Sequence, residues 1–196
     1  MLFRSALGLY FGLVVSPADY QQGETVRIMY VHVPSATMSL VVYTSMALAC
    51  AVGLVWKHPL ADLAAKAMAP IGAVFTALAL ITGSLWGQPM WGTWWVWDAR
   101  LTSELVLFFL FLGYMALNDA FDDPNRGARA SGILAIVGVV NVPIIKFSVD
   151  WWNSLHQPAS IVKLGGPSID PSMLVPLFLM FGAFGAFFVT VLIVRI

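Results

Sequence analysis

The chain has 196 residues, of which 60% are hydrophobic and 10% are charged, and its formal net charge is zero. Ordinary soluble domains carry about 25% charged residues, so this composition indicates an integral membrane protein with little mass outside the bilayer, and nothing suggests nucleic-acid binding. The single cysteine, Cys50, excludes an internal disulfide, a Cys-x-x-Cys relay and a c-type haem attachment motif. The sequence also lacks a Gly-x-x-x-x-Gly-Lys-Ser/Thr loop, so any ATP hydrolysis must come from a partner subunit.

Hydrophobic runs predict an all-α bundle of about six transmembrane helices with short loops, forming one polytopic domain over residues 1–196. The first run, Leu2–Val15, is shorter than the 20 or so residues that a span needs, so we interpret it as the second half of a truncated span. It does not resemble a signal peptide, because no small-residue cleavage site follows it. The other predicted spans are Ala36–Trp56, Ala67–Trp86, Leu101–Leu117, Ala130–Val149 (with Lys146 snorkelling outward) and Pro171–Val194.

Cationic residues in the short loops predict the orientation. One side carries six of them (Arg4, Lys57, Lys66, Arg126, Arg129, Arg195) and the other carries four (Arg27, Arg100, Lys146, Lys163). The positive-inside rule therefore places both termini in the cytoplasm. With six spans, loops one, three and five share the outer face. This predicts that His32 and His156 lie on the outer face, whereas His58 lies on the cytoplasmic side.

Residues 86–98 contain five of the eight tryptophans, and the segment 86–104 is predicted to be a tryptophan-rich loop on the outer face. Two or three aromatic residues already anchor a span, so this density favours a surface that covers a large, flat, apolar ligand. A porphyrin fits that description, with histidine as the iron ligand. A short interfacial helix would give Trp91, Trp94 and Trp95 one common face, although lipid anchoring explains the spacing equally well. Three other tryptophans, Trp86, Trp151 and Trp152, fit an aromatic belt.

Polar residues near this loop give further expectations. Asp98 is a plausible N-cap for the fourth span, and Arg100 and Glu104 have the spacing of an i,i+4 pair. Glu104 lies inside the apolar boundary, where a carboxylate is costly and indicates a function. Either outer histidine alone is more often a boundary residue than a ligand, but two beside a tryptophan loop favour ligation. Met29 and Met90 are weaker candidates for an iron ligand.

At this point the sequence resembles a known family. Trp91–Asp98 is similar to the "WWD" signature of the haem-handling proteins of cytochrome c maturation. The flanking residues 70–76 and 98–106, together with Val31–Pro34 and Trp151–Gln157, extend the likeness to the haem exporter protein C (CcmC) family over nearly the whole chain. The larger WWD relatives, the haem lyase CcmF and the CcsA type, have more spans and more histidines.

The resemblance implies a carrier of haem b rather than an enzyme, in the bacterial inner membrane, that presents haem at the periplasmic face. His32 and His156 would be the axial ligands. The other implied haem-binding residues are Trp91, Trp94, Trp95, Trp97, Asp98 and Arg100. Arg27, Arg100 and Lys163 are candidates for contacts with the propionates. The implied partners are the haem chaperone CcmE, CcmD, and the ABC transporter subunits CcmA and CcmB.

Two interpretations from other classes stay open. A membrane b-type cytochrome would carry electrons, but such proteins usually hold haem between histidines within the spans, and no histidine is predicted at mid-span. A scaffold without a ligand would use the tryptophans only as anchors.

Overall fold

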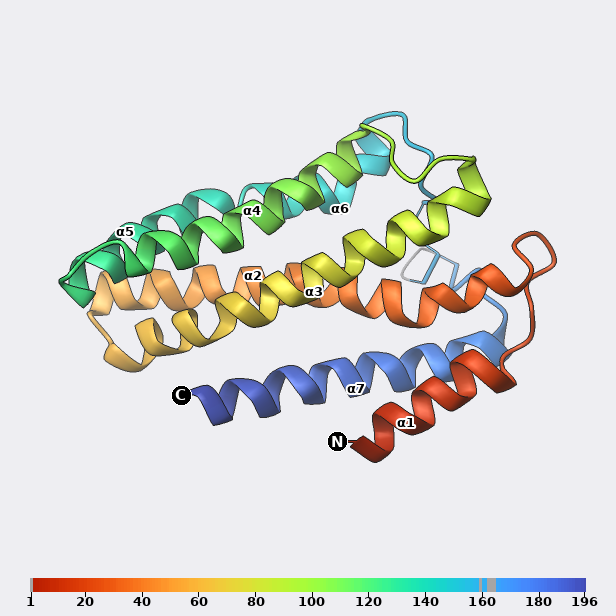
Figure 1. Ribbon diagram of the computed structural model, residues 1–196, viewed down its shortest axis with the longest axis horizontal. Helices are drawn as coiled ribbons and strands as arrows, with labels where there is room; N and C mark the ends of the chain where they lie inside the picture. Colours follow the sequence, from red (N-terminus) through yellow and green to blue (C-terminus); the bar gives the residue numbers. More distant parts are fainter. Residues whose placement is uncertain (1, 159, 162–164) are drawn as a thin grey trace.

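The computed structural model describes residues 2–158, 160–161 and 165–196, and the protein is an elongated bundle of helices (Figure 1). Five helical segments are long and apolar enough to cross a membrane, which confirms the prediction of an all-α membrane protein. The predicted first span is α1 with a π-helical turn, η1, and its apolar stretch Ala6–Val15 is shorter than a span. The elements are α1 (Leu2–Tyr10), η1 (Phe11–Val15), the 3₁₀ turn η2 (Glu24–Ile28), α2 (Met29–Trp56), α3 (Pro59–Trp91), α4 (Ala99–Asp119), α5 (Pro124–Gly138), α6 (Asn141–Trp151) and α7 (Pro171–Arg195).

Local chemistry accounts for several helix boundaries. Gly92 ends α3 in the left-handed region, at φ 74°, which glycine adopts without steric cost. The side chains of Asp98, Asp123 and Asp170 each accept a backbone N–H at the start of α4, α5 and α7 respectively, so the predicted N-cap at Asp98 is confirmed.

Two helices reach further toward the predicted outer face than the hydrophobic runs indicate. Helix α2 begins at Met29 rather than Ala36, and α3 continues to Trp91 rather than Trp86. Met29 and Tyr30 are buried in a cluster that includes α7 residues, so tertiary packing extends α2 beyond the uncharged run. His32 therefore lies on α2 itself rather than in a loop.

The fifth predicted span is not one helix but two, α5 and α6, with a break after Gly138. Pro143 explains the break because it has no N–H to donate to the carbonyl of Val139, and its ring would clash with that carbonyl in a continuous α-helix. The Val139 carbonyl accepts instead from the N–H of Val142, at 3.0 Å.

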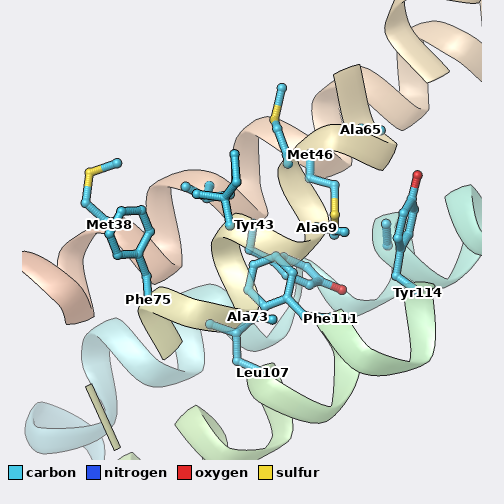
Figure 2. Packing of buried hydrophobic residues seen from close by; sticks show 14 of the residues in the cluster. Met38, Tyr43, Met46, Ala65, Ala69, Ala73, Phe75, Leu107, Phe111 and Tyr114 are labelled. Atoms are coloured by element: carbon cyan, nitrogen blue, oxygen red, sulfur yellow. The ribbon is translucent and has the colours of Figure 1, made fainter. Parts of the chain in front are cut away.

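The loops separate into two groups at the ends of the bundle (Figure 1). The segments around 16–23 and 92–98 and the described residues between α6 and α7 lie at one end, and those at 57–58 and 120–123 lie at the other. Between the ends, α2, α3 and α4 contribute a core that includes Tyr43, Met46 and Phe111 (Figure 2). Gly72 permits this packing, because a Cβ there would lie 2.1 Å from the Phe111 ring.

Candidate functional site

His32 and His156 line the same cavity, which has a volume of about 340 Å³ and lies at the end of the bundle that holds the tryptophan loop. Four helices and the segment after α6 form its walls. The charged residues along it are Arg100 and Glu104 of α4 and Lys146 of α6, and the remaining lining is mostly apolar. An apolar pocket with a few convergent polar groups is the usual form of a small-molecule site. His58 is the N-cap residue of α3, at the opposite end of the bundle.

The ring of His32 is fixed by α3. Its Nδ1 lies 3.1 Å from the carbonyl oxygen of Ala79 and 3.1 Å from Oγ1 of Thr82. A carbonyl can only accept, so the neutral imidazole carries its proton on Nδ1 and leaves the Nε2 lone pair free. Gly83 lies under the ring, where a Cβ would be 3.0 Å from Cε1, and the edge of Trp86 packs against it with centroids 5.7 Å apart.

The ring of His156 is fixed in the same way by Asp98. Its Nδ1 donates to Oδ2 of Asp98 at 3.0 Å, and the Ser154 hydroxyl donates to the same oxygen. Because a carboxylate only accepts, Nδ1 carries the proton and Nε2 again keeps its lone pair. The ring of Trp91 packs edge-on against His156, with centroids 4.8 Å apart. Both histidines thus have a hydrogen-bond partner behind the ring, a tryptophan beside it, and a free Nε2.

The Asp98 side chain connects His156 to the start of α4 through hydrogen bonds. Its Oδ1 accepts the N–H of Leu101 at 2.8 Å while its Oδ2 faces Ser154 and His156. Burial raises the pKa of Asp98, but the hydrogen bonds from Ser154 and Leu101 and the neighbouring imidazole outweigh that effect and leave the pKa below its ordinary value. Burial lowers the pKa of His156 more than Asp98 raises it, which favours the neutral imidazole that an iron ligand requires.

Trp94, Trp95 and Trp97 of the tryptophan-rich loop do not line the histidine cavity. Trp94 and Trp95 line a neighbouring shallow hollow of about 350 Å³ with residues of α3 and α4, and Leu80 lines both this hollow and the histidine cavity. Trp97 is 76% exposed. The expected interfacial helix is wrong, because α3 ends at Trp91 and residues 92–98 are not helical. The Nε1 of Trp95 is buried without a hydrogen-bond partner among the described atoms.

The basic residues predicted to contact the haem propionates differ in whether they line the cavity. Arg100 lines the cavity, whereas Arg27 is paired with Glu24 and donates to the Gly12 carbonyl. Lys163 lies outside the described residues. The predicted Arg100–Glu104 pair does not form within 4.0 Å, and Glu104 instead accepts a hydrogen bond from the Ser39 hydroxyl at 2.7 Å.

The two methionine candidates lie elsewhere. Met29 is buried in the cluster with α7, and the Met90 sulfur lies 3.9 Å from the Thr25 hydroxyl. Neither lines the histidine cavity in the part of the chain that the structure describes.

Sequence reasoning missed three residues of the site. The sequence suggests an aromatic-belt position for Trp86, but its ring packs against His32 and its Nε1 donates to Gln22. The signal for Ser154 is its position two residues before His156, which is typical of a local hydroxyl turn. Thr82 carried no signal, because its role depends on how α2 packs against α3.

The described residues contain no group of three or more His, Cys, Asp or Glu side chains that could hold a bare metal ion. Two histidines suffice for iron only when another molecule supplies the remaining ligands, as the four nitrogens of a porphyrin do. The donor set therefore fits haem.

These features define an integral membrane protein with a paired-histidine cavity at the end of its bundle that carries a tryptophan-rich loop. A family model described as "Heme exporter protein C" matches residues 1–196, and the chain belongs to this family. The chain is 62% identical to heme exporter protein C of Bradyrhizobium diazoefficiens, over 94% of this chain and 70% of that protein. It is 60% identical to heme exporter protein C of Haemophilus influenzae, over 96% and 77% of the two chains. It is also 51% identical to a mitochondrial protein of Marchantia polymorpha described as "cytochrome c biosynthesis ccmC-like", over 96% and 78%.

Proposed function

We propose that this protein holds haem between His32 and His156 at the periplasmic face of the bacterial inner membrane and passes it to the haem chaperone CcmE. As a member of the haem exporter protein C family, the protein is a multi-pass membrane component that handles haem in haem export and cytochrome c maturation. The single observation that supports the site assignment is that two histidines far apart in the sequence, His32 and His156, line one cavity with both Nε2 atoms free.

The chemistry of the cavity suits haem. Iron in a porphyrin accepts one ligand above and one below the ring, and two neutral imidazoles supply both. Arg100 provides a guanidinium for a propionate, because guanidinium binds carboxylate with two parallel hydrogen bonds. Lys163 is a further candidate from the sequence, and Arg27 is a weaker one because it is paired with Glu24 and does not line the cavity. Trp91 supports His156, and the loop Trp94–Trp97 offers apolar rings beside the cavity.

The bound species in this proposal is haem b, carried as cargo without a covalent link. A covalent thioether would need a cysteine at the site, and the sole cysteine, Cys50, is buried in the core cluster. The family name is that of a transport component, which fits a carrier rather than an enzyme. ATP hydrolysis would then belong to CcmA, working with CcmB and CcmD, since the sequence has no phosphate-binding loop.

Family membership does not favour the two alternatives. An electron-carrying b-type cytochrome needs haem deep enough to exchange electrons through the spans, whereas His156 lies in a loop and His32 lies near the outer end of α2. A ligand-free scaffold gives no reason for two histidines with matched orienting partners around one cavity.

The test is the Soret absorbance of the purified protein after titration with haem. We expect a six-coordinate spectrum with a stoichiometry of one haem per chain. A titration in which the absorbance remains that of free haem would refute the proposal.

A further inference from the structure

We infer that haem enters the histidine cavity sideways from the bilayer, through an opening between α2 and α6; this inference rests on the proposed function. The cavity is not enclosed on this side. Three side chains that line it are exposed: Thr37 and Val41 on α2 and Lys146 on α6. Val41 is 45% exposed although it lies within a predicted span, so it faces lipid.

The opening lies beside the outer helix of the broken span, α6. Helix α2 packs extensively against α5 but makes few contacts with α6, which packs against α4 instead. Asn141, the first residue of α6, holds the outer half of the broken span to α4 by donating from Nδ2 to the Ser103 carbonyl at 2.8 Å. The few contacts between α2 and α6 leave this part of the cavity wall open.

Between the cavity and the cytoplasmic end of the bundle, the helices are tightly packed. On the cytoplasmic side of the cavity, the side chains of Tyr43, Leu107 and Phe111 are completely buried (Figure 2). The rings of Tyr43 and Phe111 meet edge to face with centroids 5.0 Å apart. Interiors packed in this way have no room for a group as large as a porphyrin. The core therefore blocks a route along the bundle axis from the opposite end of the bundle.

The residues at the opening match an amphipathic ligand. Haem has an apolar ring and two carboxylates. The α2 side of the opening offers Val41 and the methyl group of Thr37, and the α6 side offers the ammonium group of Lys146. Lys146 has no carboxylate within 4.0 Å in the described chain, and Arg100 lines the same cavity as the histidines. A propionate would therefore find a cation at the entrance and a second one inside.

The test narrows the opening without touching the histidines. Thr37→Trp and Val41→Trp are compared with Val74→Trp, a substitution on an exposed face of α3 where Val74 is 54% exposed. Each full-length protein is reconstituted in vesicles, and haem is supplied from a second, haem-loaded vesicle population. Stopped-flow Soret absorbance gives the loading rate, and transfer to empty acceptor vesicles gives the release rate.

We expect the two opening variants to lower both rates by about 10-fold, equivalent to about 1.4 kcal/mol of added barrier, and to keep the six-coordinate spectrum because neither replaced side chain is an iron ligand. Loading and release must slow together, because a narrower passage raises the barrier in both directions, whereas a weakened site would release haem faster. Unaltered rates in both opening variants would overturn the inference, as would equal slowing by Val74→Trp. Failure of the proposed function is distinguishable, because the unsubstituted protein would then bind no haem at all. Two positions on successive turns of α2 keep the test decisive if one variant does not fold.

Discussion

Asp98 is the residue whose replacement tests the site most finely, because it holds His156 without lining the cavity. We predict that Asp98→Asn weakens haem binding while the protein still folds and inserts. The asparagine Oδ1 can still accept from the N–H of Leu101 and cap α4. Its amide group then replaces Oδ2 and presents an N–H donor to Nδ1 of His156, where the carboxylate accepted.

The expected loss of haem affinity follows from placing an N–H donor where the carboxylate accepted a hydrogen bond. The Asp98 side chain is 5% exposed and that of His156 is 17% exposed, so water does not readily replace the lost partner. To keep Nε2 free for iron, His156 must leave its Nδ1–H facing another donor, and a buried unsatisfied donor costs about 1–3 kcal/mol. This corresponds to an increase of roughly 5- to 150-fold in the Kd for haem, close to the 10- to 100-fold cost that is usual for partners of metal-ligating histidines.

The assay is an equilibrium haem titration followed by Soret absorbance, with the visible bands reporting six- or five-coordinate iron. Asp123→Asn is the matched control, because Asp123 caps α5 through the N–H of Asn125 at the opposite end of the bundle and contacts no histidine. An Asp98→Asn protein with the Kd and spectrum of the unsubstituted protein would refute the reasoning. Equal weakening in the control would attribute the effect to helix capping alone.

Two further predictions concern orientation and the loop. A reporter fused after Gln88 or at Gln157 is expected to read periplasmic and one at Asp62 cytoplasmic, and a cytoplasmic signal at Gln88 would exclude presentation of haem to the periplasm. Replacing Trp94 and Trp95 together by Ala is expected to weaken haem retention or capture by CcmE while the protein still inserts, since these rings form an apolar surface beside the cavity. Normal cytochrome c maturation in that double variant would show that the rings serve only as anchors.

The fold was largely predictable because the long uncharged runs leave few alternatives in a bilayer, and alternation of loops then placed the two outer histidines on one side. The broken fifth span was also within reach, since Pro143 stands in the middle of that run. The contacts that orient the rings of His32 and His156 were not predictable from the sequence. Asp98 and His156 are 58 positions apart, and Trp86 meets His32 only because α2 begins at Met29, before its uncharged run, and packs against α3. Such contacts depend on tertiary packing, which periodicity does not encode.

The central claim is that His32 and His156 together ligate haem iron, and substitution of both residues tests it most directly. Haem titrations are compared for His32→Ala, His156→Ala, the double variant and His58→Ala, a control at the other end of the bundle. We predict that each outer single variant loses the six-coordinate spectrum and regains it in part when imidazole fills the vacated position, which simple misfolding would not allow. The double variant should retain little haem and His58→Ala should bind haem normally. An unchanged six-coordinate spectrum in the double variant would contradict the account.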